Sequence, residues 1–413
     1  MTTDVRDIKR VIREIYPSIR ALRRDLHRHP EIGYEEVRTA KKVSEHLRKL
    51  KIPHKRKVGK TGVVGLVRGT RSGKCIALRA DMDALAMQEK NRFAHRSVYD
   101  GRMHACGHDG HTANLVGVAH VLSRLREHVR GSVKLLFQPS EEGGAGAAAM
   151  MEDGALEHPK PDVIYGLHQT PAIPLGKIGY RSGPMCASTA SVDVVFHGRG
   201  AHAARPHQAI DPIMMASTFV QTVQTIVSRR VDPLERAVLT FGTCHAGTAR
   251  NVIPDEARLT GTVRAYKRKV QNLILRELRR IARNVARAMG GTAEIEIEAG
   301  YPPVINDNKA TAFLKRIAIE TVGKGNVVEA EPTMGGEDFA FFLEEVPGAF
   351  FRLGNGRPER PAHSPTFDFD DRALQTGMLV LSLLAIRWLE GHDETVQEGP
   401  PGGDARMPSA LLW

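Results

Sequence analysis

Four short apolar runs, separated by segments with helical periodicity, constrain the fold of this 413-residue chain more than any other feature. The runs are CIALRA, VKLLF, VIYGL and AFFRL, and each has the length and apolar character of a buried strand. The segment ANLVGVAHVLSRL, between the first two runs, has apolar residues at helical spacing. This alternation predicts an α/β domain with a mostly parallel sheet.

The sequence pattern changes near residue 183. From there to residue 299 the chain reads as strand, helix, two strands, helix and strand. This order predicts a split βαβ unit with an antiparallel sheet. We therefore expect a larger α/β domain built from residues 1–183 and 300–392, with a smaller α+β domain of residues 184–299 inserted in it. Residues 393–413 are rich in glycine and proline, which predicts a disordered tail.

Residues that bind metals or transfer protons follow the apolar runs. In an open α/β sheet, ligands bind at the carboxyl ends of the strands. The polar residues at these points are Asp81 and Asp83 after the first run, Glu141 and Glu142 after the second, His168 after the third and His363 beyond the fourth.

The segment MHACGHDGHTAN, residues 103–114, leads into the predicted helix and holds further donor side chains. Cys106 and His108 are the expected metal ligands, whereas His104, Asp109 and His111 are expected to fix the loop and the helix start. Two metal ions need about five or six protein ligands. The chain supplies a mixed set of sulfur, nitrogen and oxygen donors: Cys106, His108, Glu142, His168 and His363.

The paired glutamates indicate catalysis rather than a purely structural metal. Glu142 would bind metal, while Glu141 would face the attacking water as general base. Asp83 would orient a histidine ligand or bridge the metals. Asp81 is interpreted as either a supporting group or a helix-capping residue.

Composition limits the other classes of function. The net charge of +12 fits a solvated basic surface or an anionic partner. Binding to nucleic acid is not expected, because aromatic residues make up only 5% of the chain and form no basic platform. A thiol hydrolase that uses Cys106 stays open and would resist chelators. The N-terminus lacks a signal-peptide core and the four cysteines form no CxxC motif, so we expect a cytoplasmic protein that binds no membrane.

Eight segments, in chain order, resemble the motifs of a two-metal metallopeptidase family that contains aminoacylase, glutamate-releasing carboxypeptidases and hippurate hydrolase. They are LRADMDAL, MHACGHDGHTANL, FQPSEEGGAGAAAM, GLH, GRGAHAARPH, NVIPDEARLTGTVRAY, MGGEDFAFF and AHSPTFDFDD. Within this family, the cysteine in CGHDGH resembles the motif of the amidohydrolase branch, because the other branches have an aspartate-centred motif at this point. The amidohydrolase branch includes hippurate hydrolase, N-acyl-amino-acid amidohydrolases and auxin-conjugate hydrolases. Ala86 stands where the family has proline, which predicts a looser turn behind Asp83.

The resemblance implies a zinc-exopeptidase-like catalytic domain with a lid domain that mediates dimerisation. It also implies two divalent metal ions per subunit, of Mn, Zn, Ni or Co, held by the five donors named above. Glu141 matches the general base, and Asp83 matches the aspartate that supports the base or the metal site. His202 matches a lid histidine that, in related dimers, enters the partner's site and stabilises the oxyanion. Asn251 and Arg264 match lid positions that hold the substrate carboxylate.

The reaction implied is hydrolysis of a small, hippurate-like N-acyl amino acid to a carboxylic acid and a free amino acid. Glu141 would assist the attack of a metal-bridging water on the amide. The resemblance further implies a homodimer, or a higher homo-oligomer, formed through the lid. A dipeptidase or metallo-carboxypeptidase on the same fold is the alternative, and a dipeptidase would need an acidic partner for the free α-amino group.

Overall fold

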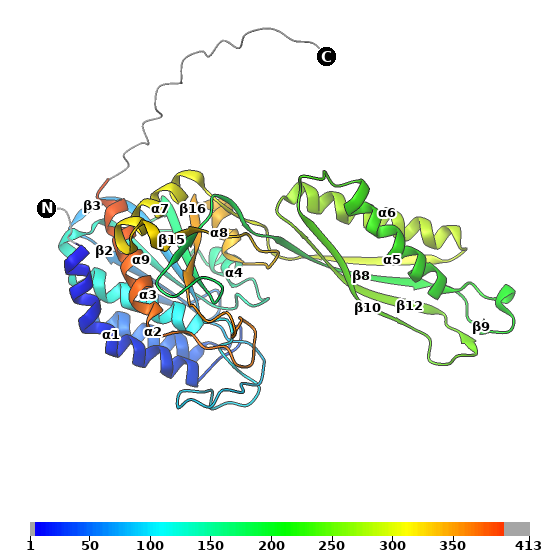
Figure 1. The fold of residues 1–413 in the computed structure, drawn as a ribbon, viewed down its shortest axis with the longest axis horizontal. Helices are drawn as coiled ribbons and strands as arrows, with labels where there is room; N and C mark the ends of the chain where they lie inside the picture. Colours follow the sequence, from blue (N-terminus) through cyan, green and yellow to red (C-terminus); the bar gives the residue numbers. More distant parts are fainter. Residues whose placement is uncertain (1–4, 392–413) are drawn as a thin grey trace, which may run out of the picture.

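The computed structural model describes residues 5–391, which form two domains with separate sheets (Figure 1). The larger domain contains the N-terminal and C-terminal parts of the described chain, and the smaller domain extends from it. The predicted tail at 393–413 lies outside the described residues.

The sheet of the larger domain has the strand order β1-β2-β4-β3-β5-β16-β6-β15. Its four central strands are parallel to one another and contain the four apolar runs: β4 (Arg130–Gln138), β3 (Arg71–Asp81), β5 (Val163–Thr170) and β16 (Gly348–Gly354). Both sides of this group carry antiparallel pairings, through β1 (His54–Val58) and β2 (Gly62–Arg68) at one edge and through β6 (Ile178–Tyr180) beside β16 at the other. The last strand, β15 (Val327–Glu329), pairs in parallel with β6. The predicted α/β domain with a mostly parallel sheet is therefore confirmed.

Helices cover both faces of this sheet because alternate strand residues point to opposite sides. On one face, Leu78, Leu135 and Phe351 pack in the core that includes α1 (Val5–Arg28), α3 (His108–Arg124), α7 (Asn308–Val322) and α9 (Ala373–Leu389). The neighbouring Ala77 and Leu136 pack instead on the other face, with α4 (Gly146–Glu152) and α8 (Phe339–Glu345). Helix α2 (Val37–Lys49) covers the β1–β2 edge. The apolar run MLVLSLLAI lies in α9, and no helix among residues 5–391 is long and apolar enough to cross a membrane.

The smaller domain is the predicted split βαβ unit. Its elements run β8 (Ser188–His197), α5 (Pro212–Arg229), β10 (Ala237–Ala246), β12 (Glu256–Ala265), α6 (Arg268–Ala288) and β13 (Thr292–Ala299). The strands form an antiparallel sheet in the order β10-β12-β8-β13 around a separate apolar core. This arrangement confirms the predicted architecture of the inserted domain.

The two segments that connect the domains run side by side. Strand β7 (Gly183–Cys186) pairs with β14 (Val304–Asn306), outside both larger sheets. Directly next to them, Thr189 and Tyr301 are hydrogen-bonded through their backbones. At the far end of the inserted domain, β9 (Ala201–His202) pairs with β11 (Val252–Ile253) (Figure 1). Short 3-10 turns complete the described fold: η1 (Arg126–His128), η2 (Pro206–Gln208) and η3 (Lys324–Asn326).

Candidate metal centre

Donor side chains from separate elements meet at the carboxyl ends of the central strands. The sulfur of Cys106 and ring nitrogens of His108 and His168 lie within 4.8 Å of one another. A second group with the same spacing contains Cys106, Glu142 and His363. Cys106 belongs to both groups and would therefore be a ligand common to them. The five ligands predicted from the sequence are thus brought together.

Backbone geometry presents the donors on the loop before α3 and on the loop after β16. Gly107 has φ +90°, and a Cβ atom there would lie 2.7 Å from the Gln169 side chain. Glycine is therefore required between the two loop donors. His363 also adopts a left-handed backbone, with φ +62°, and its amide donates to the Ala105 carbonyl at 2.8 Å. This bond fixes His363 beside Cys106.

The histidine hydrogen bonds leave nitrogen lone pairs directed into the cluster. Nδ1 of His108 lies 3.2 Å from Asp83 Oδ1, while its buried Nε2 has no hydrogen-bond partner among residues 5–391. Nδ1 of His168 donates to the Gln169 carbonyl at 2.6 Å, and its Nε2 lies 3.3 Å from the Cys106 sulfur. Histidine ligands of metals are typically oriented in this way, with the other ring nitrogen bonded to a carboxylate or carbonyl. The residues therefore fit a pair of divalent metal ions.

The predicted supporting residues surround these ligands. His111 uses both nitrogens, one with Asp81 Oδ1 at 2.6 Å and one as acceptor from the Gln169 amide at 2.8 Å, so it has no lone pair for a metal. Asp81 therefore anchors a histidine and does not cap the helix with its side chain. Asp109 is buried with Arg23 and His27, and Arg23 and His27 hold the pKa of its carboxyl far below the usual range despite burial. His104 is buried beside them, its ring nitrogens have no hydrogen-bond partner in the described part of the chain, and burial lowers its pKa to about 4.

The solvent exposure of the donor side chains increases from one side of the site to the other. His108 is fully buried, whereas the side chain of His363 is 54% exposed. Hydrogen bonds to Cys106 and Glu142 raise the pKa of His363 to about 10. Burial, with the nearby Glu142 carboxylate, raises the pKa of the Cys106 thiol. A substrate would accordingly reach the metal ligands from the side of His363.

Glu141 is buried next to the ligands and is placed differently from its neighbour Glu142. Burial raises its pKa well above the usual range, and the carboxylates of Glu337 and Glu142 add to this effect. Carboxyl oxygens of Glu141, Glu337 and Asp338 lie within 4.8 Å of one another. A carboxyl with a raised pKa can both accept and return a proton near neutral pH.

A buried arginine holds these acidic residues together and was missed in the sequence. The Arg79 guanidinium donates to Asp81 Oδ2 at 2.6 Å, to Gln138 Oε1 at 2.7 Å and to Asp338 Oδ1 at 3.0 Å. It also forms an ion pair with Glu337 at 3.0 Å. The one signal was a charged residue inside the apolar run CIALRA, because a fully buried arginine requires buried acidic partners.

The three lid residues predicted from the resemblance do not meet in one chain. His202 is in β9 and Asn251 is beside it, since the Ala203 amide donates to the Asn251 carbonyl at 3.0 Å. Both are exposed at the end of the inserted domain farthest from the larger sheet (Figure 1). Arg264 lies in β12 at the other end of the inserted domain. Its Nη1 atom is 3.5 Å from the position that a Cβ atom on Gly336 would occupy, and Gly336 directly precedes Glu337. Only Arg264 is therefore close to the acidic cluster of its own chain.

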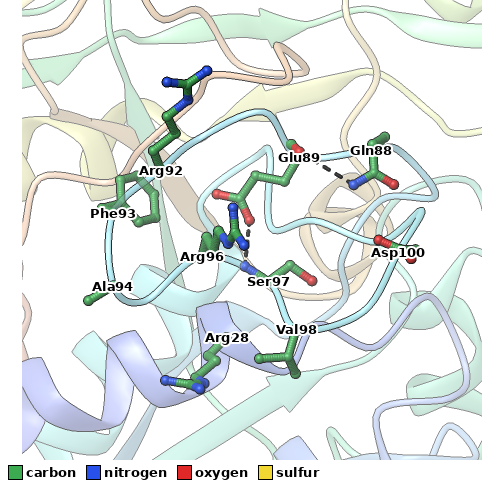
Figure 2. Close-up of a pocket in the computed structure, with 10 residues that line it drawn as sticks. All are labelled: Arg28, Gln88, Glu89, Arg92, Phe93, Ala94, Arg96, Ser97, Val98 and Asp100. Carbon is green, nitrogen blue, oxygen red and sulfur yellow. Dashed lines mark hydrogen bonds between the residues drawn. The ribbon is translucent and has the colours of Figure 1, made fainter.

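A separate cavity of about 700 Å³ lies in the 88–100 loop, and the residues that line it do not include the candidate metal ligands. Residues 88–100 enclose it together with Arg28 at the end of α1 (Figure 2). The Glu89 carboxylate accepts from the Ser97 amide inside this loop and also bonds His27, the partner of Asp109. The loop is thus tied to the start of α3, but it holds none of the predicted ligands.

Comparisons with known proteins identify the family of this chain. The family described as Peptidase family M20/M25/M40 matches residues 77–387. IAA-amino acid hydrolase ILR1-like 4 of Arabidopsis thaliana is 40% identical over 89% of this chain and 85% of its own length. N-acetylcysteine deacetylase of Bacillus subtilis is 39% identical, over 89% of this chain and 96% of its own.

A solved structure gives the same result. The Bacillus subtilis YXEP protein, described as a dinuclear metal binding peptidase from the M20 family, is 35% identical, with a TM-score of 0.81. The likeness covers 92% of this chain and 99% of that one. The chain belongs to the M20/M25/M40 peptidase family and is a hydrolase that acts on amide bonds, which confirms the family predicted from the motifs.

Proposed function

We propose that this family member is a metal-dependent amidohydrolase that cleaves N-acyl amino acids, of which hippurate is one, to a carboxylic acid and a free amino acid. The observation that carries the proposal is the buried Glu141 carboxyl next to two donor groups that share Cys106. The names of two relatives support the substrate class, since they describe an IAA-amino acid hydrolase and an N-acetylcysteine deacetylase.

The metal ions would be held by Cys106, His108, Glu142, His168 and His363. When bound, two divalent ions supply Lewis acidity that favours both the attack of water and the build-up of charge on the carbonyl oxygen. Asp83 keeps the ring of His108 oriented through Nδ1, and its other oxygen accepts the Glu142 amide at 2.9 Å. One aspartate thus orients a donor of each group.

Glu141 moves the proton in this scheme. Its carboxylate takes a proton from the water that attacks the amide carbon and then delivers it to the nitrogen of the leaving amine. The acidic neighbours Glu337 and Asp338 favour proton uptake, because a second negative charge beside them is unfavourable. Arg264 would hold the substrate carboxylate through its guanidinium.

We further propose a homodimer, or a higher homo-oligomer, in which His202 and Asn251 act in the site of the partner subunit. These two residues form one exposed unit at the end of the lid, too far from their own metal ligands to touch the same substrate (Figure 1). His202 would stabilise the developing oxyanion, and Asn251 would bind the substrate carboxylate together with Arg264. A cytoplasmic location stays a prediction.

The base assignment is tested with Glu141→Gln, assayed for amine release with its metal content measured. The variant should keep its metal and retain less than about a tenth of the wild-type rate, since a positioned base contributes 10²–10⁴-fold. Glu152→Gln, an exposed glutamate of α4, is the matched control and should be fully active. A Glu141→Gln enzyme with normal metal content and more than a tenth of the activity rules out the scheme.

The role of the partner subunit is tested by mixing two inactive variants, Glu141→Gln and His202→Ala. In a mixed dimer, one of the two sites combines an intact Glu141 with an intact His202 from the other subunit. Random mixing of equal amounts makes about half of the dimers mixed, so it should restore about a quarter of the wild-type activity. If His202 acts in its own chain, mixing restores nothing.

The substrate class is tested by a screen of the metal-loaded enzyme over N-benzoyl, N-acetyl and indole-acetyl amino acids, beside dipeptides. The family and the YXEP protein are both described as peptidases, which favours a dipeptidase or carboxypeptidase as second candidate. Faster release from dipeptides than from every N-acyl amino acid would favour that candidate. Metal analysis of the purified protein identifies the ion among Mn, Zn, Ni and Co.

A further inference from the structure

The turn that carries Glu141 and Glu142 has an unfavourable backbone. Ser140 has φ +50°, Gly143 has φ +97° and Ala145 has φ +52°. Left-handed conformations of non-glycine residues persist only where the surroundings fix them. The position of the general base therefore depends on the groups that bind this turn.

Side chains from distant segments satisfy the polar backbone groups of the turn. Glu36 accepts the Ser140 amide at 2.8 Å, and Asp83 accepts the Glu142 amide at 2.9 Å. The Tyr34 hydroxyl donates to the Gly144 carbonyl at 2.5 Å. These three residues belong to the larger domain.

Tyr301 makes the largest set of bonds to the turn. Its hydroxyl donates to the Glu141 carbonyl at 2.6 Å and accepts the amides of Gly143 at 2.8 Å and Ala145 at 3.3 Å. A phenolic oxygen has one proton to donate and two lone pairs, so these bonds use its full capacity. The Tyr301 proton is committed to the turn, and the hydroxyl is a positioning group rather than a donor to substrate.

Tyr301 is part of the connection between the two domains. Its carbonyl accepts the Thr189 amide at 2.9 Å, and its amide donates to the Thr189 hydroxyl at 2.8 Å. Thr189 is the second residue of β8, the first strand of the lid, whereas Tyr301 follows β13, the last one. Thr189 also packs against Gly336, because a Cβ there would be 2.6 Å from Thr189 Cγ2. A rotation of the lid about these segments would therefore displace the Tyr301 backbone.

We propose that Tyr301 is a positioning residue that fixes the Glu141 turn and ties the placement of the general base to the connection between lid and catalytic domain. The proposal rests on the proposed role of Glu141. It follows from the three bonds of one hydroxyl to a turn with unfavourable φ angles, and from the bonds of the same residue to Thr189.

Tyr301→Phe removes the hydroxyl and keeps the ring, which packs edge-to-face on Phe341. In the metal-loaded enzyme kcat should fall about 10- to 100-fold, because small misplacement of a catalytic group has an effect of that size, and KM should change less than about threefold. Thr189→Val, which removes only the hydroxyl that accepts the Tyr301 amide, should lower kcat in the same direction. A normal kcat for Tyr301→Phe would overturn the proposal.

Hydrogen exchange of the turn gives a readout that does not depend on activity or metal. The amides of Gly143 and Ala145 should exchange at least about tenfold faster in Tyr301→Phe than in wild type, both with metal and after chelation. Tyr165→Phe is the matched control, since it removes another buried tyrosine hydroxyl, which donates to the Ala310 carbonyl at 3.1 Å. Unchanged exchange in Tyr301→Phe, or equal acceleration in the control, contradicts the proposal.

A double-mutant cycle separates this proposal from the proposed function. If Tyr301 acts through Glu141, adding Tyr301→Phe to Glu141→Gln should not slow the residual reaction further. A further loss in the double variant means that Tyr301 acts on something else and overturns the proposal. If Glu141→Gln alone is fully active, the base assignment fails instead, and the exchange experiment still tests the contact between Tyr301 and the turn.

Discussion

Replacing Arg79 with methionine should destabilise the catalytic domain in a way that grows with pH. The guanidinium is fully buried and lies 2.6–3.0 Å from carboxylate oxygens of Asp81, Glu337 and Asp338. Removing one partner of a buried ion pair costs about 3–5 kcal/mol, because the remaining charge stays buried without compensation. Several carboxylates share Arg79, so we expect the upper part of this range at pH 8.

The pH dependence follows from the carboxyl groups. Burial raises the pKa of Asp338 to about 8, and Arg79 is the strongest influence that lowers it. A carboxyl whose pKa is higher in the folded state stabilises the fold at low pH, and this stability is lost as pH rises towards the folded pKa. Without Arg79 the pKa of Asp338 rises further, and the loss continues above pH 8. Each additional retained proton steepens the fall in stability by about 1.4 kcal/mol per pH unit.

The assay is urea unfolding of chelated protein between pH 5.5 and 8.5. Trp388, packed in α9, reports the catalytic domain when Trp413 is replaced by phenylalanine. Arg56→Met, an exposed arginine of β1, is the control and should stay within about 0.5 kcal/mol of wild type at every pH. The reasoning is refuted if Arg79→Met costs less than about 1 kcal/mol at pH 8, or if its cost shrinks as pH rises.

Two further predictions concern the metal ligands and the departure from the family motif. Cys106→Ser should lose most of the metal at both positions, because Cys106 belongs to both donor groups. His363→Ala should keep about one equivalent of metal, and Cys244→Ser, at an exposed cysteine, about two. Metal analysis after gel filtration is the measurement, and full loading of Cys106→Ser would contradict a ligand role shared by both groups. Ala86→Pro should raise the free energy of unfolding by about 0.4–1 kcal/mol. Ala86 is exposed, and Leu85 before it already has the bridge-forming backbone, paired with Met103, that a following proline favours. A lower Tm would show that the turn cannot accept proline.

The sequence predicted the fold and the convergence of the five candidate donors because both depend on local patterns. Buried parallel strands are recognisable as continuous apolar runs, and their carboxyl ends must meet at one edge of the sheet. The polar residues at the carboxyl ends of β3, β4 and β5 therefore meet regardless of details elsewhere in the chain. His363 was located with them although it lies in a long loop, and its left-handed backbone could not be foreseen from the residue type.

What the sequence did not predict depends on partners far apart in the chain. Arg79 was visible as a charged residue in an apolar run, but nothing local identifies Glu337 and Asp338, more than 250 positions away, as its partners. The Tyr301 hydroxyl is a similar case, since its acceptor lies 160 positions earlier. Such contacts are fixed by topology, and topology emerges only when the strands are ordered in a sheet.

The acidic residues around the metal ligands explain why the site needs positive charge from more than one source. Asp81, Asp83, Glu142, Glu337 and Asp338 converge there with Glu141, and Arg79 is the one arginine bound to this group among the described contacts. Burial and mutual repulsion favour protons on Glu141, Glu337 and Asp338. Divalent ions on the donors would supply positive charge on the side of Glu142 and Cys106, which bind metal as anions. Arg79 instead balances the negative charge of Asp81, Glu337 and Asp338. Glu141 is then the carboxyl of this group that can exchange a proton with substrate.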